Sequence, residues 1–166
     1  VLASEGLRVV YGGGATGLMG AVADAALSKG GRVLGVIPGF MEEVEWGHKG
    51  VTELRVVDDM HERLRHMKQE SDAFVSLTGG CGTFDELFQT LTWKRLGLHT
   101  GPIVIVNTNG YYDPTIAQLE RAVSEGFMDT RHAGMWSVVA DADAIPTALH
   151  DAPEWTDDSI SFARPQ

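Results

Sequence analysis

The sequence is poor in cysteine, in basic side chains and in long apolar runs. Cys81 is the only cysteine, which excludes a disulfide framework and a thiolate-rich zinc site and favours a reducing, cytoplasmic location. Thirteen Lys and Arg against 23 Asp and Glu leave a net charge of −10, which disfavours binding to nucleic acid or to an anionic membrane surface. No stretch approaches the roughly 20 apolar residues of a membrane span, and residues 1–5 lack the pattern of a signal peptide.

The 166 residues are enough for one domain with a substantial core. Short, continuously apolar runs predict buried parallel strands at residues 7–11, 33–38, 73–77, 103–107 and, with a weaker pattern, 136–140. The expected helices between them are residues 17–29, 60–70, 83–96, 113–125 and 142–150. This alternation predicts a single α/β domain over residues 1–166, a Rossmann-like, doubly wound parallel sheet in a three-layer α/β/α sandwich. The tail from about residue 152 has no predicted place.

A glycine-rich loop follows the first expected strand, at the position where open parallel sheets bind ligands. Gly12, Gly14 and Gly17 fit the G-x-G-x-x-G pattern of a phosphate-binding turn before a helix. A dinucleotide site would also need an acidic residue at the end of the next strand, and that strand ends at Pro38 without one. Two alternatives stay open here: a dinucleotide-dependent oxidoreductase, and glycines that only pack a tight turn.

A second glycine-rich loop, residues 78–83, follows the expected strand 73–77. Its glycine amides can form an anion-binding nest, and a helix that starts at Thr83 would point its positive end at the same place. In the structural alternative, Thr83 and Glu86 form a capping box, S/T-x-x-E, in which the glutamate only satisfies the backbone. Two such loops after two strands favour a phosphate site at one edge of the sheet.

The second loop also carries a family signature. Residues 78–86 match P-G-G-x-G-T-x-x-E, the hallmark of the LOG ("Lonely Guy") family of cytokinin riboside 5′-monophosphate phosphoribohydrolases, except that Thr78 replaces the proline. Residues 60–64 match the family's M-H-x-R-K, except that Leu64 replaces the lysine. Further matches lie, in the expected order, at residues 11–14, 17–20, 71–74, 91–93, 96–99 and 109–113. The chain therefore resembles the LOG family from residue 7 to about residue 127.

The resemblance implies a reaction and a set of site residues. The reaction is hydrolysis of the N-glycosidic bond of a nucleoside 5′-monophosphate, either a cytokinin riboside monophosphate or AMP, with no metal or organic cofactor. Glu86 would be the catalytic glutamate and Arg63 would act with it. The implied substrate-binding residues are Gly12, Gly13, Glu45, Met60, Gly79, Gly80, Cys81, Gly82, Thr83 and Thr92. The family also opens with a strand upstream of Val1, so we expect that the N-terminal strand is missing from this chain.

The residue types fit that chemistry. Cleavage of an N-glycosidic bond passes through a ribosyl cation-like state, which a carboxylate such as Glu86 can stabilise while it orients the attacking water. Arg63 shares one helix face with Met60 and Met67, so we expect its guanidinium to emerge from an apolar stripe and not from the solvated side. A nucleotide-binding module without catalysis stays open, although the presence of both Glu86 and Arg63 favours the hydrolase.

The sequence gives less support to a catalytic or metal-binding role for the other reactive side chains. No histidine close in sequence marks Cys81 as a nucleophile, and His61 and His66 do not form an H-E-x-x-H motif, which disfavours a metal site. Asp59, three residues before Glu62, predicts a helix cap. No lysine follows a strand beside a glycine loop, as a pyridoxal Schiff base would require. The sequence thus argues against the label "lysine decarboxylase-like" that many bacterial LOG proteins carry.

The resemblance also implies a homodimer with the active site near the subunit interface. The expected helix 83–96 supports an oligomer, because its large apolar residues cover more of the circumference than one sheet face can bury. These residues are Phe84, Leu87, Phe88, Leu91 and Trp93.

Overall fold

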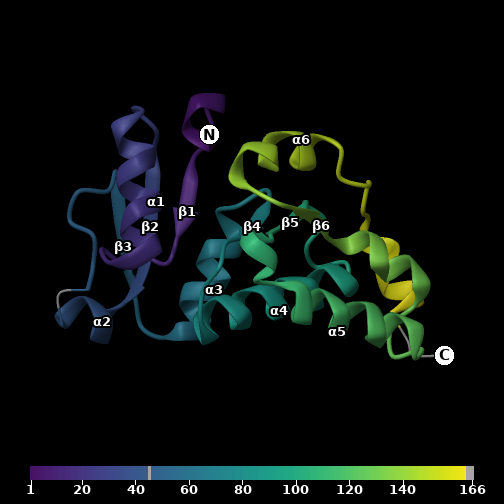
Figure 1. The fold of residues 1–166 in the computed structure, drawn as a ribbon. Coiled ribbons are helices and arrows are strands. Elements are labelled where there is room, and N and C mark those ends of the chain that lie inside the picture. Colours follow the sequence, from purple (N-terminus) through teal and green to yellow (C-terminus); the bar gives the residue numbers. More distant parts are fainter. Residues whose placement is uncertain (45, 164–166) are drawn as a thin grey trace. The chain divides into compact units, whose positions relative to one another are not determined.

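The computed structural model describes residues 1–44 and 46–163, and the chain forms two compact units, Val1–Ser71 and Asp72–Gln166. Each unit contains a three-stranded parallel sheet flanked by helices (Figure 1). The parallel α/β architecture predicted from the sequence is confirmed, although the hydrogen bonds form two sheets and not one continuous sheet. Within the described residues, no helix is long and apolar enough to cross a lipid bilayer.

The first unit has the strand order β1-β2-β3. Its strands are β1 (Val9–Tyr11), β2 (Val33–Pro38) and β3 (Glu53–Val57). Its helices are α1 (Gly17–Ser28), α2 (Gly39–Glu43) and α3 (Met60–Gln69), with a 3-10 turn at Leu2–Glu5. In register, Val9 pairs with Val33 and Leu34 pairs with Glu53.

Both faces of β2 are buried, as its continuous apolar sequence predicts. Val33 belongs to a cluster that includes Ala23 and Ala26 of α1, whereas Leu34 and Val36 belong to a cluster packed against Met67 of α3. Because successive strand residues point to opposite faces, α1 and α3 cover opposite sides of this sheet. The first unit is therefore itself layered α/β/α.

The second unit has the strand order β4-β5-β6. Its strands are β4 (Phe74–Ser76), β5 (Ile103–Val106) and β6 (Ser137–Val139). Its helices are α4 (Cys81–Arg95), α5 (Asp113–Ser124) and α6 (Ile145–His150). Four 3-10 segments complete it: Thr108–Gly110, Thr130–Met135, Ala142–Ala144 and Asp157–Phe162.

The core of the second unit lies between β5 and the two helices α4 and α5. Ile103 and Ile105 of β5 pack with Leu87 and Leu91 of α4 and with Leu119 of α5. The helix α6 packs against β5 and β6 and lies on the other side of the sheet in Figure 1. This packing joins α4, whose first turn follows the second glycine loop, to the centre of the sheet.

The polar tail that the sequence leaves unplaced packs against the end of α4. The indole of Trp155 donates a 2.8 Å hydrogen bond to the Lys94 carbonyl, and the Ser159 hydroxyl donates to the same carbonyl at 3.2 Å. The Arg95 guanidinium donates to the Ala163 carbonyl. The Lys94 side chain is buried and donates a 2.7 Å hydrogen bond to the Gly101 carbonyl.

Candidate active site

The second glycine loop connects β4 to the N-terminus of α4. The helix starts at Cys81, with Gly80 as its N-cap residue, and the Phe84 amide donates to the Gly80 carbonyl at 3.1 Å. The helix therefore begins two residues before Thr83, the start expected from the sequence. The amides of the first turn, Cys81, Gly82 and Thr83, have no acceptor within the helix and are available to an anion at its positive end.

The glycines of this loop have two different structural roles. At Gly79 a Cβ atom would overlap the Thr83 hydroxyl, so any other residue would require the Thr83 side chain to move. Gly80 and Gly82 have neither a positive φ angle nor any atom within 4 Å of the place a Cβ would take. Packing of the described residues therefore does not require glycine at 80 or 82, and bare backbone there is what a closely approaching phosphate needs.

Glu86 lies on α4 one turn after Thr83 and is half-buried. The capping-box alternative predicted from the sequence is wrong, because Gly80 and not Thr83 caps the helix and no side chain caps it. Burial raises the pKa of Tyr112, and the charge of Glu86 contributes to the same direction. Glu86 thus lies on the first turns of α4, at the helix end that carries the glycine loop, and its charge acts on the Tyr112 phenol.

In the first unit, Arg63 and Met60 of α3 lie under the first glycine loop. The Arg63 side chain is buried, and its Nε donates to the Val36 carbonyl at 3.2 Å, so the prediction that it emerges from the apolar face of α3 is confirmed. A Cβ at Gly12 would overlap the Arg63 guanidinium. Gly12 and Arg63 are therefore brought together, with the Met60 sulfur 4.0 Å from Arg63 Nη1.

The remaining glycines of the first loop are explained by local geometry. Gly13 has a φ of +77°, and a Cβ there would press on Ile37. The Tyr11 hydroxyl donates to the Gly14 carbonyl at 3.1 Å, and burial raises the pKa of Tyr11 to about 12. A Cβ at Gly20 would collide with the Ala15 carbonyl. Close packing or a positive φ angle thus accounts for Gly13, Gly17 and Gly20, in contrast to Gly80 and Gly82 of the second loop.

The other predicted site residues fall in different places. Cys81 is exposed in the first turn of α4, and Glu45 lies outside the described residues. Thr92 is exposed on α4, six residues beyond Glu86, which places the two side chains about 120° apart around the helix and about 9 Å apart along it. Within this chain Thr92 does not join the glycine loop.

The surroundings of Leu64 and Thr78, which replace the lysine and the proline of the family signatures, and of the predicted helix cap Asp59 are visible in the structure. Leu64 is buried in α3, where the apolar side chain fits and a lysine would need a partner for its charge. Asp59 caps α3, as predicted, by accepting a 2.8 Å hydrogen bond from the Glu62 amide. Thr78 is the first residue of the loop, and the carbonyls of its neighbours Leu77 and Gly79 accept hydrogen bonds from two tyrosines.

Those tyrosines, Tyr111 and Tyr112, are the site residues that sequence reasoning missed. The Tyr111 hydroxyl donates to the Gly79 carbonyl, and the Tyr112 hydroxyl donates to the Leu77 carbonyl at 2.6 Å. The N-G-Y-Y-D match at residues 109–113 marks them in the sequence but does not show what they contact.

Two sets of side chains bear on metal and Schiff-base chemistry. Among the described residues, no group of three or more His, Cys, Asp or Glu side chains is placed to hold a metal ion. Burial lowers the pKa of Lys94 to about 8, but its ammonium is enclosed under the Trp155 ring and bonded to Gly101. This lysine stabilises the end of α4 and does not face the glycine loop.

Comparison with known proteins identifies the family. A family model described as "Possible lysine decarboxylase" matches residues 19–149. The chain belongs to this family. The LOG resemblance of the sequence motifs is thereby confirmed, because relatives with the LOG activity in their names match the same chain.

Three relatives show how close the match is. A cytokinin riboside 5′-monophosphate phosphoribohydrolase from Rhodococcoides fascians is 51% identical over 128 residues, which are 76% of this chain and 65% of the relative. The probable phosphoribohydrolases LOGL1 and LOGL9 of Oryza sativa subsp. japonica are 46% and 40% identical, over 76% and 93% of this chain. The chain spans 57% and 66% of the length of these two, which is less than two thirds.

A solved structure supports the fold. The molybdenum cofactor carrier protein of Chlamydomonas reinhardtii matches with a TM-score of 0.67 at 22% identity, over 91% of this chain and 80% of that one. At this identity the likeness concerns the fold alone.

Proposed function

We propose that this protein hydrolyses the N-glycosidic bond of nucleoside 5′-monophosphates and releases free base and ribose 5-phosphate. The observation that carries the proposal is the bare backbone at Gly80 and Gly82, at the positive end of a 15-residue helix, one turn before Glu86. Relatives named cytokinin riboside 5′-monophosphate phosphoribohydrolases support both the reaction and the substrate class. The proposed substrates are a cytokinin riboside 5′-monophosphate and AMP.

In the proposed mechanism the 5′-phosphate is anchored by the loop Gly79–Thr83. The free amides of Cys81, Gly82 and Thr83 and the dipole of α4 stabilise its negative charge. Anchoring at the phosphate uses binding energy remote from the reacting bond to position the ribose. The spacing of one helical turn between the loop and Glu86 supports a role for this carboxylate near the sugar of a phosphate-bound nucleotide.

Glu86 is the proposed catalytic carboxylate. As the bond to the base breaks, positive charge grows on the ribosyl ring and negative charge grows on the leaving base. The Glu86 carboxylate stabilises the first of these charges and accepts a proton from the attacking water. Arg63 is proposed as the second catalytic group, because the LOG signature pairs it with the glutamate and because a guanidinium offers a permanent charge and several donors to a ribose hydroxyl or phosphate oxygen.

We also propose that the protein works as a homodimer. Phe88, Thr92 and Leu96 of α4 line a cavity of about 150 Å³ that also borders Leu119 of α5 and Met128. The apolar surface there is smaller than the sequence predicts, because Leu87 and Leu91 are buried in the core of their own unit, while Phe88 stays 42% exposed. If Thr92 contacts nucleotide, as the resemblance implies, its position away from the glycine loop of its own chain favours a substrate held by a second copy.

Product analysis tests the proposed function. The protein is incubated with a panel of nucleoside 5′-monophosphates, including AMP and N6-prenylated AMP, and free base and ribose 5-phosphate are quantified. We expect both products in equal amounts from at least one monophosphate. A parallel incubation of lysine with pyridoxal phosphate is expected to give no cadaverine. Binding of monophosphates without release of base would instead indicate a non-catalytic nucleotide-binding module.

A further inference from the structure

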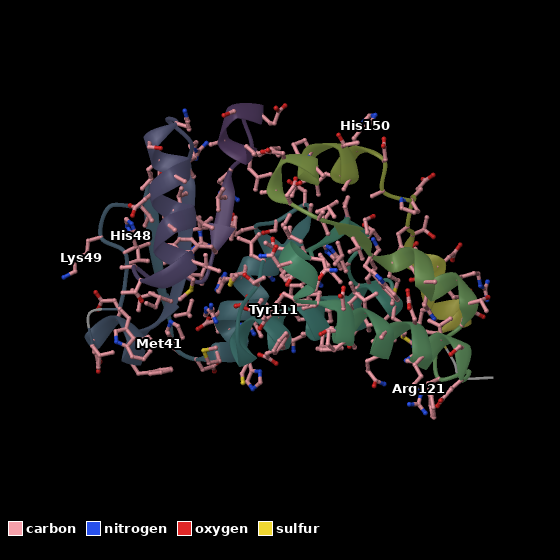
Figure 2. All side chains as sticks on the ribbon, in the orientation of Figure 1. Met41, His48, Lys49, Tyr111, Arg121 and His150 are labelled. Carbon is pink, nitrogen blue, oxygen red and sulfur yellow. The ribbon has the colours of Figure 1, made fainter. Side chains whose placement is uncertain are left out.

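Two tyrosines of the loop between β5 and α5 form hydrogen bonds with backbone carbonyls at the second glycine loop. The Tyr111 hydroxyl donates to the Gly79 carbonyl, and the Tyr112 hydroxyl donates to the Leu77 carbonyl at 2.6 Å and lies 2.8 Å from the Ser76 hydroxyl (Tyr111 is labelled in Figure 2). Thr78, which replaces the proline of the family signature, lies between the two residues whose carbonyls accept these hydrogen bonds. The backbone that enters the phosphate loop is therefore fixed from outside and not by a proline ring.

A hydrogen-bonded turn over residues 107–113 positions the two tyrosines. Asn107 accepts a 2.7 Å hydrogen bond from the Tyr112 amide and donates a 2.7 Å hydrogen bond to Asp113. Asn109 adopts the left-handed conformation with a φ of +54°, and Gly110 follows with a φ of +74°. Glycine adopts this conformation without strain, whereas Asn109 is the only non-glycine residue with a positive φ among the residues that the structure describes.

Aromatic contacts tie the same turn to the first turn of α4. The Tyr111 ring is nearly parallel to Phe84, at 7° and 6.4 Å between centroids. Tyr112 meets the edges of both rings, at 6.2 Å from Phe84 and 5.2 Å from Tyr111. Phe84 is the residue whose amide closes the first turn of α4 on Gly80. The rings thus hold Tyr111 at a fixed distance from the glycine loop.

The hydrogen bond of Tyr111 has a consequence one residue further along. In a trans peptide unit the carbonyl and the next amide lie in one plane and point in opposite directions. Holding the Gly79 carbonyl toward Tyr111 therefore turns the Gly80 amide away from Tyr111. Gly80 is the open N-cap residue of α4, and its conformation has no side chain to restrict it. Without the Tyr111 hydroxyl this peptide plane would be free to rotate.

We propose that Tyr111 is a positioning residue of the phosphate site, which acts through the Gly79–Gly80 peptide to preset the amides of the glycine loop before the phosphate binds. The inference rests on the proposed function, since it names the group that prepares that site. Tyr112 has a different role: its side chain is fully buried and its hydroxyl holds the end of β4, so it supports the fold.

The variant Tyr111→Phe tests the proposal because it keeps the ring and removes only the hydroxyl. Since Tyr111 is 44% exposed, little destabilisation is expected, and the melting temperature should stay within about 2 °C of wild type. The loss of one hydrogen bond predicts a fall of roughly 5- to 10-fold in affinity for ribose 5-phosphate, measured by calorimetry. In turnover, KM for the monophosphate should rise by the same factor while kcat changes less.

Tyr112→Phe is the matched comparison, because it removes the hydroxyl of the neighbouring ring. It should lower the melting temperature by several degrees, since a buried carbonyl and the Ser76 hydroxyl lose their partner, with a smaller change in ribose 5-phosphate affinity. A second readout follows the backbone directly: in a ¹⁵N-labelled protein, the Gly80 amide should have a lower order parameter in Tyr111→Phe than in wild type.

The outcomes separate this proposal from the proposed function. Wild-type affinity for ribose 5-phosphate in Tyr111→Phe, or a wild type that binds no ribose 5-phosphate, overturns the positioning role. A wild type that binds ribose 5-phosphate but releases base from no monophosphate refutes the hydrolase, while the loss of affinity in Tyr111→Phe would still support the positioning role.

Discussion

At the scale of single residues, the second glycine loop shows two reasons for glycine within a few positions. A Cβ atom at Gly79 would overlap the Thr83 hydroxyl, whereas Gly80 and Gly82 face open space. The first kind of glycine serves the fold, and the second kind leaves room for a ligand. Glu86 follows at the next helical turn and is half-buried.

Substitution of Glu86 by Gln separates catalysis from structure. The amide keeps the shape but removes the charge and the proton acceptor, so turnover of a nucleoside monophosphate should fall roughly 10²-fold or more, the scale typical of acid–base groups. The melting temperature should be nearly unchanged. Cys81→Ser, in the exposed first turn of α4, is the control and should keep most of the turnover. Wild-type turnover in Glu86→Gln would remove this residue from the mechanism.

The sequence could predict these residues but not their geometry. The signature over residues 78–86 and the apolar spacing of α3 point to Glu86 and Arg63 directly. The helix start was misplaced because a threonine three residues before a glutamate has the pattern of a cap, while glycines rarely begin a helix on propensity alone. The hydroxyl contacts of Tyr111 and Tyr112 join segments more than 30 residues apart in the chain, at separations of 32 and 35, which local patterns cannot show.

At the scale of elements, continuously apolar strands were predicted well and the charged edge strand was missed. The bounds of β2 agree with the sequence, and β1, β4, β5 and β6 lie within the expected ranges. β3 was not predicted, because Glu53 and Arg55 interrupt its apolar pattern. In the structure these two side chains pair with each other, and Arg55 also pairs with Glu70, which makes a charged strand stable at the edge of its sheet.

The packing of the C-terminal segment on His132 predicts an acid-sensitive element. His132 is fully buried beside the rings of Trp155 and Phe162, and neither ring nitrogen has a hydrogen-bond partner among the residues that the structure describes. Burial, and then the positive charge of Arg95, lower the pKa of His132 below its ordinary 6.5. The charges of Asp129 and Arg131 also act on it, in opposite directions.

Because the folded pKa of His132 lies below the unfolded one, the unfolded state takes up the proton first as the pH falls below about 6.5. The free energy of unfolding should therefore decrease between pH 7.5 and pH 5, a window above the titration of the carboxylates. His132→Phe keeps the aromatic contacts and removes the proton, so its melting temperature should vary less across that window. An equal acid dependence in both proteins would contradict this account.

At the scale of the whole molecule, each unit is a parallel sheet with helices, and the family is shared with phosphoribohydrolases of a bacterium and of rice. The cytoplasmic location, the single domain and the dimer stay predictions. Among these the dimer bears most directly on function, because it would explain why Thr92 of α4 stands apart from the glycine loop.

Sedimentation at micromolar concentration tests the dimer, which should have twice the monomer mass of 17.9 kDa. Phe88→Asp places a charge on the exposed outer face of α4 and should shift the equilibrium to monomer with loss of turnover. Phe40→Asp, at a comparably exposed apolar residue of α2, is the matched control and should sediment as wild type. A fully active wild-type monomer would refute this prediction.

The requirement for the 5′-phosphate tests the central claim most directly. If the amides of the second glycine loop anchor that phosphate, kcat/KM for AMP or a cytokinin riboside monophosphate should exceed kcat/KM for the matching nucleoside by roughly 10²-fold or more, since each hydrogen bond to a charged group contributes about 1.5–3 kcal/mol. Release of free base is measured from each monophosphate and its nucleoside under the same conditions. Equal values of kcat/KM for the two would contradict the claim that this loop is a phosphate site.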